Sequence, residues 1–243
     1  MDTITYILLA LGALLGSTIS GITGVGGGMV YLPILVWGVG VKSAVPYLTM
    51  LLLVANVSRA YFARRGINWS VFRYFALGAI PGAILGALFY TLLSAYWIAK
   101  ALGVYLLVYV ALNFTKATWP KRATLKSISF IGFPAGVISS VVGGTGPVVA
   151  PWLLRYGLVK EAFLGTEAIG AATIHLVKLS IWSSAGLIKA HDILLLLPLG
   201  VVMVFGSYLG TRVVRHMDTR IFRALLMLTL AAVGIRFLFF RTL

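Results

Sequence analysis

The chain has 243 residues, 60% of them hydrophobic and 10% charged, whereas soluble domains average about 45–50% apolar and about 25% charged residues. A soluble globule of this size needs a polar exterior, so the composition excludes that class and predicts a chain surrounded mainly by lipid. The net charge of +15 fits Lys- and Arg-rich cytoplasmic loops rather than nucleic-acid binding, and the absence of cysteine excludes disulfides, thiolate metal sites and cysteine nucleophiles.

The apolar stretches predict an all-α polytopic membrane protein, because a helix needs about 20 residues to cross the hydrocarbon core and its backbone must be hydrogen-bonded there. Two regions are apolar but interrupted by glycine, and six others are long enough for full spans. We expect the first region to be retained, since it lacks the basic start of a cleaved signal peptide. In chain order these are the broken region 3–40, spans 43–63, 73–94 and 97–114, the broken region 127–157, and spans 161–184, 193–211 and 220–240.

Basic residues predict the orientation of the spans, because cytoplasmic loops carry an excess of Lys and Arg. Span 43–63 then runs inward and span 161–184 runs outward. Each broken region must return to the side from which it enters, as a hairpin or a re-entrant pair, and both termini are expected outside the cytoplasm. The connections rich in Lys and Arg are 59–73, 115–126, 155–160 and 212–223.

The two halves of the chain share a pattern. GITGVGGGMVYLP at 21–33 matches SSVVGGTGPVVAP at 139–151, and each proline is followed at the same distance by a lysine, Lys42 or Lys160. Each half holds an odd number of crossings, so the halves would be inverted repeats. Inverted repeats that share Gly/Pro-interrupted segments indicate a secondary transporter with its site near the midplane. The expected parts are a first repeat (1–114), a cytoplasmic linker (115–126) and a second repeat (127–243), each repeat a glycine-broken hairpin plus three full transmembrane helices.

Several motifs together resemble the TauE/SafE family of membrane permeases, over nearly the whole chain. In the first half they are SGITGVGGGMVYLPIL, the basic loop with GINW, and PGAILGAL; in the second they are GVISSVVGGTGPVVAPWLL and LGTEA. The resemblance implies a bacterial inner-membrane exporter of sulfur-containing anions such as sulfite, thiosulfate or small organosulfonates, with both termini in the periplasm. Thr145 departs from the family's glycine run, and it either offers a hydroxyl to the substrate or is tolerated in the turn.

The two glycine clusters suit an oxyanion, which needs hydrogen-bond donors when it loses its water shell. Helix starts offer unpaired N–H groups and a partial positive charge, and glycine lets the backbone approach a ligand. The alternative is close helix packing through small residues, which fits Gly78, Gly82 and Gly86 better than a site does. The candidate ligand clusters are Gly24, Gly26, Gly27 and Gly28, and Gly143, Gly144, Thr145 and Gly146.

Span 161–184 carries three ionisable residues, Glu167, His175 and Lys178, within about 80° of one another on the helix. Such residues face the protein interior or a cavity rather than lipid. Lys178 is expected to attract the anion, or else to snorkel outward. Glu167 is expected to neutralise Lys178 through intervening groups or to bind a coupling proton. His175 is expected to be a structural hydrogen-bonding residue or a proton relay, because the unperturbed pKa of histidine lies near neutrality.

The matching span 43–63 supplies the other candidates. Thr49 corresponds to Thr166 and Asn56 to His175, and all are polar at middle depth. Arg59 shares a face with Asn56 and is expected either at the cytoplasmic lip of an anion path or as a snorkelling arginine. The tryptophans are expected to be interfacial anchors near span ends; they are Trp37, Trp69, Trp97, Trp119, Trp152 and Trp182.

Other functions fit less well. GVGGG is not a nucleotide loop, because no Gly-Lys-Ser/Thr follows it. An intramembrane enzyme would need a nucleophile motif or paired aspartates that the sequence lacks, so neither catalysis nor a cofactor is expected. A passive anion channel and an uptake carrier remain open, as does a homodimer. The substrate-binding candidates are Gly24, Gly26, Gly27, Gly28, Thr49, Asn56, Arg59, Gly143, Gly144, Thr145, Gly146, Thr166, His175 and Lys178, with Glu167 and His175 as proton-coupling candidates.

Overall fold

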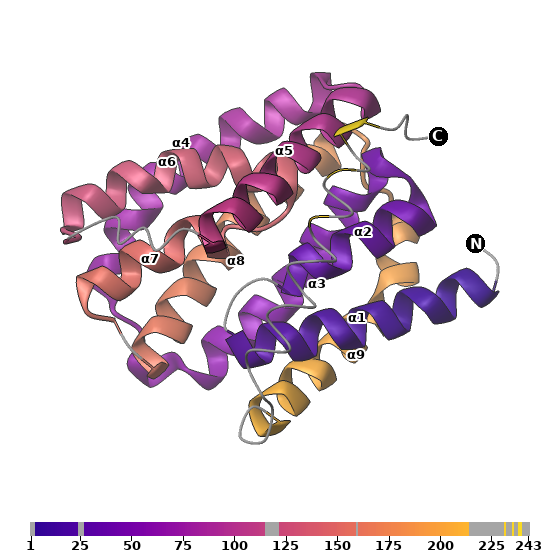
Figure 1. Cartoon of the computed structure of the whole chain (residues 1–243). Coiled ribbons are helices and arrows are strands. Elements are labelled where there is room, and N and C mark those ends of the chain that lie inside the picture. Colours follow the sequence, from indigo (N-terminus) through magenta and orange to yellow (C-terminus); the bar gives the residue numbers. More distant parts are fainter. Residues whose placement is uncertain are drawn as a thin grey trace.

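A computed structural model describes residues 3–23, 27–114, 122–158 and 160–213, and the single residues 231, 235, 238 and 239. Throughout this part of the chain the regular elements are helices (Figure 1). The predicted span 220–240 lies almost entirely outside the described residues, as do 115–121 of the predicted linker. The helices are α1 (Thr3–Thr23), α2 (Gly27–Val39), α3 (Val41–Phe62), the short 3₁₀ helix η1 (Arg64–Gly66), α4 (Trp69–Leu92), α5 (Ala95–Phe114), α6 (Leu125–Val142), α7 (Gly146–Tyr156), α8 (Lys160–Ser184) and α9 (Ala190–Val213).

Within the described ranges, six helices are long and apolar enough to cross a membrane, so the prediction of an all-α polytopic membrane protein is confirmed. Four of them match the predicted spans 43–63, 73–94, 161–184 and 193–211. The other two are α1 and α6, which open the two broken regions. Each of these regions is thus one spanning-length helix of 21 or 18 residues followed by a shorter one of 13 or 11 residues.

Local sequence explains where these helices begin and end. The Asn68 side chain caps α4 by accepting from the N–H of Val71 at 3.0 Å. Thr124 and Ser127 form a reciprocal capping box at the start of α6. At the end of α6, Gly143 takes the left-handed conformation with φ of 89°, which glycine adopts without strain. The glycine at position 143 therefore explains why α6 ends there and the chain breaks before α7.

The first broken region is an antiparallel hairpin, as predicted. Glycines on α1 let α2 approach closely: a Cβ on Gly12 would meet Tyr31 at 3.1 Å, and one on Gly16 would meet the carbonyl oxygen of Gly27 at 2.9 Å. Nearer the open end of the hairpin, Gly38 lies against Leu9. Residues 24–26, between the two helices, lie outside the described part.

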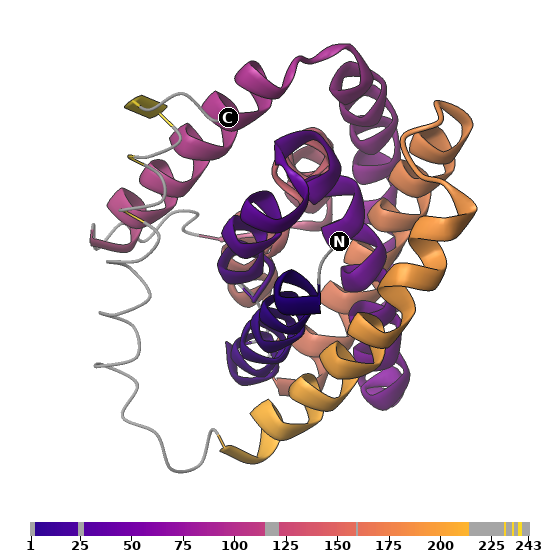
Figure 2. The same ribbon diagram turned by 90° about the vertical axis from the view of Figure 1, so that its right-hand side faces the viewer.

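Two pairs of long helices run in parallel at the two sides of the bundle (Figures 1 and 2). In the α4–α6 pair, a Cβ on Gly78 or Gly82 would collide with backbone oxygens of α6, and one on Gly86 would meet Ser140 at 2.8 Å. The expectation that these glycines serve helix packing is confirmed. In the α1–α9 pair, Gly206 lies against Ser17, and the Tyr6 hydroxyl donates to the carbonyl of Leu195 at 2.9 Å.

These pairs exchange helices between the two halves of the chain. The first helix of the first half packs on α9, and α6, the first helix of the second half, packs on α4. Helices α3 and α8 pack against each other in the middle. An inverted repeat predicts such an exchange, because its two-fold axis maps one pair onto the other.

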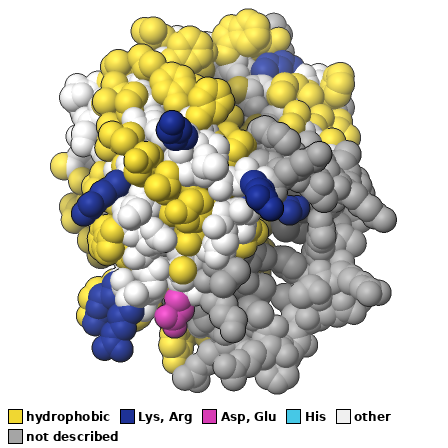
Figure 3. Space-filling view, turned by 90° about the vertical axis from the view of Figure 1, so that its left-hand side faces the viewer, with side chains coloured by type: hydrophobic (Ala, Val, Ile, Leu, Met, Phe, Trp, Pro, Cys, Tyr) yellow, Lys and Arg dark blue, Asp and Glu magenta, His cyan; other side chains and the backbone are white. Residues whose placement is uncertain are grey.

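Large hydrophobic side chains are exposed along the outer faces of the bundle. Leu77, Phe130 and Leu194 are examples, and in Figure 3 hydrophobic side chains gather over much of one face while Lys and Arg stand singly. Such a surface suits lipid rather than water.

The tryptophans divide into two groups. Trp37, Trp69 and Trp97 are exposed near helix ends, where interfacial anchoring remains the prediction, and Trp119 lies outside the described residues. The prediction is wrong for Trp152 and Trp182, which are buried. The ring nitrogen of Trp182 donates to the carbonyl of Ala87 at 3.2 Å. An apolar residue near a span end can thus serve helix contacts that sequence position does not reveal.

Candidate functional site

The centre of the molecule is the antiparallel contact between α3 and α8. At one end, a Cβ on Gly165 would lie 2.7 Å from the carbonyl oxygen of Ala63. At the other end, the Tyr90 hydroxyl donates to the carbonyl of Lys42 at 2.8 Å, and its ring packs on Trp182 with centroids 4.9 Å apart. This contact buries the polar face predicted for span 161–184, so Glu167, His175 and Lys178 all lie in the interior.

The two helix breaks meet at one side chain, Leu48 of α3. A Cβ on Gly28, in the first turn of α2, would lie 3.7 Å from Cδ2 of Leu48. A Cβ on Gly143, where α6 ends, would lie 2.7 Å from the same atom. The described residues that flank the two interruptions, from opposite halves of the chain, therefore approach the same leucine.

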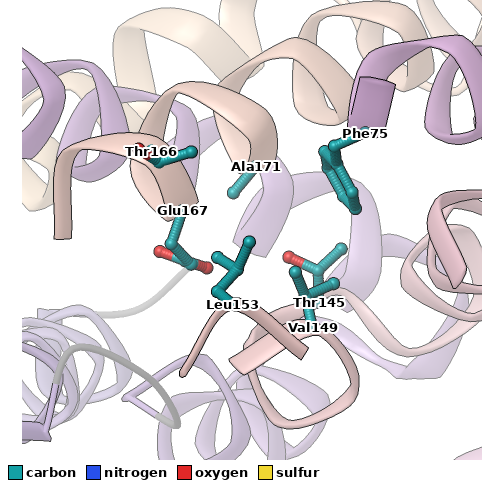
Figure 4. A pocket seen from close by; sticks show the side chains of 7 residues that line it. All are labelled: Phe75, Thr145, Val149, Leu153, Thr166, Glu167 and Ala171. Atoms are coloured by element: carbon teal, nitrogen blue, oxygen red, sulfur yellow. The ribbon is translucent and has the colours of Figure 1, made fainter. Parts of the chain in front are cut away.

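A small cavity opens beside the second break (Figure 4). Its polar lining includes the Thr145 hydroxyl and the Glu167 carboxylate, which point toward each other across Leu153. The cavity holds about 10 Å³, about the room that one water molecule needs. An oxyanion with three oxygens does not fit until the surrounding helices move apart. The lining residues are Phe75, Thr145, Val149, Leu153, Thr166, Glu167 and Ala171.

Arg59 connects three helices around this cavity. Its guanidinium donates to the Ser20 hydroxyl of α1 at 3.3 Å, to the Asn56 side-chain oxygen of α3, and to Glu167 Oε2 of α8 at 3.4 Å. The Arg59 side chain is 16% exposed and that of Glu167 is 5% exposed. Arg59 therefore does not snorkel to the surface, and Glu167 pairs with Arg59 rather than with Lys178.

Lys178 is fully buried, which rules out the snorkelling alternative. Its ammonium donates to both the carbonyl and the hydroxyl of Ser139 at 3.0 Å each, and lies 5.5 Å from the centre of the Trp182 ring. Ser139 belongs to the last turn of α6, where the negative end of the helix dipole favours a cation. Lys178 thus holds the end of α6 immediately before its break.

Two of the residues predicted to bind substrate each have a side-chain polar atom that is buried without a hydrogen-bond partner among the described residues. They are Nδ1 of His175 and the hydroxyl oxygen of Thr49. His175 lies within electrostatic reach of both Lys178 and Arg59. Leaving a buried polar atom unpaired costs about 1–3 kcal/mol, so such atoms indicate a place where a further polar group binds.

The remaining candidates are placed differently. Gly24 and Gly26 lie outside the described residues. Gly27 packs tightly on Gly16 and Ser20 of α1, which is a packing contact. Thr166 lines the cavity, but its hydroxyl oxygen accepts from the N–H of Asn68 at 2.9 Å. Gly144 has open space around it and Gly146 begins α7.

Two serines that contact the buried cations were not predicted from the sequence. Ser20 and Ser139 each stand four residues before the first glycine of a cluster, and each accepts from the buried cation 39 residues later, Arg59 or Lys178. The number of residues that separates Ser20 from Ser139 also separates Arg59 from Lys178. The same separation between the two halves pairs Asn56 with His175, and Leu48 with Glu167. This shared spacing was readable in the sequence, but its meaning required knowing that the serines face the cations.

An all-helical, membrane-spanning bundle with helix interruptions that meet beside buried charges has the architecture of a secondary transporter. A family model described as "Sulfite exporter TauE/SafE" matches residues 8–237, so the chain belongs to this family, and the resemblance inferred from the motifs is confirmed. A Haemophilus influenzae protein described as "Probable membrane transporter protein" is 30% identical over 109 residues, which are 45% of this chain and 42% of that protein. The match thus spans less than half of that relative's length. No solved structure matches this chain.

Proposed function

We propose that this protein exports small sulfur-containing oxyanions, such as sulfite, thiosulfate or small organosulfonates, across the bacterial inner membrane. The observation that carries the proposal is that Gly28 and Gly143, which flank the two helix breaks, both lie close to the Leu48 side chain. The family description supplies the sulfur-anion class, and the proximity of the two breaks supports a site at this point.

The chemistry around this point suits a negative ligand. Arg59 and Lys178 bring two cations into the interior, and each is bonded to a serine that stands four residues before a glycine cluster. At the start of α7 the N–H of Val148 bonds to the Thr145 carbonyl at 3.0 Å and Pro147 has no N–H, so the N–H of Gly146 and the helix dipole are what this helix start offers to an anion. Such donors replace the water shell that an oxyanion loses inside the membrane.

Transport requires the closed cavity to open toward each side in turn. The exchanged pairs α1–α9 and α4–α6 support two inverted repeats, and rocking of one repeat against the other would provide alternating access. Coupling to protons through Glu167 or His175 is part of this proposal, as is an orientation with the arginines of 59–73 in the cytoplasm and both termini in the periplasm.

A thermal-shift screen of the purified protein tests the substrate class. The ligands are sulfite, thiosulfate, sulfoacetate, taurine and sulfate. A specific ligand stabilises the state that it binds, by about 2.7 kcal/mol at a concentration of 100 times its Kd. We expect at least one of these sulfur anions to raise the unfolding midpoint, while chloride at equal ionic strength does not. No shift with any of them contradicts the proposed substrate class.

Proteoliposome flux separates a carrier from a passive anion channel. The cavity of about 10 Å³ favours the carrier, because it is too small for an oxyanion in this conformation. We expect flux that saturates with anion concentration and accelerates when a countersubstrate is present on the other side. Flux that grows linearly with concentration would indicate a channel instead.

A further inference from the structure

The carboxylate of Glu167 lines the same small cavity that the proposed anion would enter. We infer that ionised Glu167 and the anion compete for the guanidinium of Arg59, so that each anion is carried together with a proton bound to Glu167. This inference rests on the proposed function and specifies its coupling.

Charge repulsion is the first argument. Two negative charges a few ångströms apart in a water-poor interior repel each other strongly, and sites that hold two acidic groups relieve this by binding a proton. Glu167 is 5% exposed and therefore lacks the water that would screen it. An anion beside Thr145 is compatible with Glu167 only when the carboxyl is protonated.

The second argument is the asymmetry between the halves. Arg59 and Lys178 hold equivalent positions, each bonded to the serine 39 residues before it. In the register that relates Arg59 to Lys178, Glu167 has Leu48 as its equivalent, and this register replaces the rough correspondence of Thr49 with Thr166. Among the described residues the carboxylate of Glu167 bonds to Arg59 at 3.4 Å, and Lys178 bonds to Ser139. One cation is therefore held by an exchangeable anion, and the other is held by neutral groups.

The groups around Glu167 leave it as the titrating site. From α3 it faces Arg59, and on α8 itself His175 and Lys178 follow two and three turns later. α4 and α7 present apolar side chains to the cavity, and Ser20 of α1 reaches Arg59. Charged residues on the neighbouring elements are exposed to the surroundings and do not line the cavity; they are Arg64 and Arg65 of η1, Arg73 of α4 and Arg155 of α7.

The exchange balances in charge for a monoanion, because one proton neutralises Glu167 as one negative charge enters; a dianion such as thiosulfate moves with its proton as one net negative charge. A proton from water binds a carboxylate oxygen of Glu167, and the guanidinium of Arg59 transfers its hydrogen bond from that oxygen to the anion. When the anion leaves on the other side, Glu167 releases its proton there and pairs with Arg59 again. The proton and the anion consequently move in the same direction.

Two measurements on the wild-type protein test this without any variant. Thiosulfate is the probe, because it stays ionised between about pH 5 and about pH 8. A proton required for binding makes thiosulfate affinity fall by up to tenfold per pH unit once the carboxyl ionises. In proteoliposomes containing a pH-sensitive dye, a thiosulfate gradient should move protons in the direction of thiosulfate.

Glu167→Gln removes the titrating group while keeping the shape of the side chain. We expect this variant to bind thiosulfate with an affinity that no longer depends on pH, and to exchange thiosulfate without moving protons. Glu161→Gln is the matched control, since Glu161 is exposed at the start of the same helix, and it should behave as wild type.

The outcomes separate this inference from the proposed function. Thiosulfate flux with no proton movement, proton movement opposite to the anion, or pH-dependent binding that survives in Glu167→Gln contradicts the inference and leaves an anion carrier. Absence of binding and flux for every sulfur anion contradicts the proposed function, and this inference with it. If Glu167→Gln does not fold, the two wild-type measurements decide.

Discussion

At the scale of single residues, Lys178 is the clearest case of a charge held inside the membrane region by specific partners. The ammonium is fully buried and bonds to both polar oxygens of Ser139. The Ser139 carbonyl also accepts from the N–H of Gly143 at 2.8 Å. Removal of the ammonium therefore leaves the turn itself closed, so the protein should still fold and insert.

Lys178→Met keeps the apolar stem and removes the charge. If Lys178 helps to bind the anion, the variant loses one charge-assisted hydrogen bond, worth about 1.5 kcal/mol or roughly tenfold in affinity. The measurement is a thiosulfate titration of the unfolding midpoint, with Lys126→Met at an exposed position as the control. If Lys178→Met binds thiosulfate with the affinity of the wild type, Lys178 does not bind the anion and serves only to hold the end of α6.

The sequence predicted which residues of α8 are buried, but not their partners. Helical periodicity alone places Glu167, His175 and Lys178 on one face, and the cost of a charge in lipid turns that face inward. The pairing of Glu167 with Arg59 depends on how α3 and α8 align. Periodicity within one helix contains no information on that register, so Lys178 was the partner expected for Glu167.

At the scale of elements, close glycine contacts fix the α4–α6 pair. The backbone of α6 occupies the space that a side chain at Gly82 would need, whereas nothing lies within 4 Å of a Cβ on Gly144. Adding a methyl group should therefore lower the stability of the protein at Gly82 but not at Gly144.

Gly82→Ala should destabilise the protein by about 1–3 kcal/mol or more, because backbone rather than a flexible side chain must move. Gly144→Ala should leave the unfolding midpoint unchanged. Thermal unfolding of the two purified variants in detergent provides the comparison. Equal midpoints for the two variants would contradict the assignment of Gly82 to helix packing.

Helix existence was predictable here and helix length was less so. Runs of apolar residues gave the spans, and Gly143 and Pro147 marked the second break. From the sequence, 3–40 and 127–157 were expected to be broken regions without a full span. In the structure, however, α1 and α6 each reach spanning length before the break. The reason is that the glycine clusters lie late in each region, after 21 and 18 helical residues.

At the scale of the whole molecule, the proposed orientation in the membrane rests on the distribution of charge. The arginines of 59–73 lie at one end of the α3–α8 pair, where Ala63 meets Gly165. The turn between α8 and α9, with Lys189, follows the other end of α8. The positive-inside rule favours the first end as the cytoplasmic one, and this is the orientation that we propose.

Single cysteines can report this orientation, because the natural chain contains none. Arg65 and Lys189 are both exposed. A membrane-impermeant maleimide added to intact cells should label Lys189→Cys, and should label Arg65→Cys only after the cells are opened. The reverse pattern would contradict the proposed orientation and place both termini in the cytoplasm.

We propose that two helix breaks, one from each half of the chain, form one anion site. Hydrogen–deuterium exchange of the wild-type protein, with and without thiosulfate, tests it at the backbone amides themselves. We predict slower exchange in peptides covering 20–30 and 140–150, with the same dependence on thiosulfate concentration for both. Protection in only one of these stretches, or in neither while thiosulfate still stabilises the protein, would contradict a shared site.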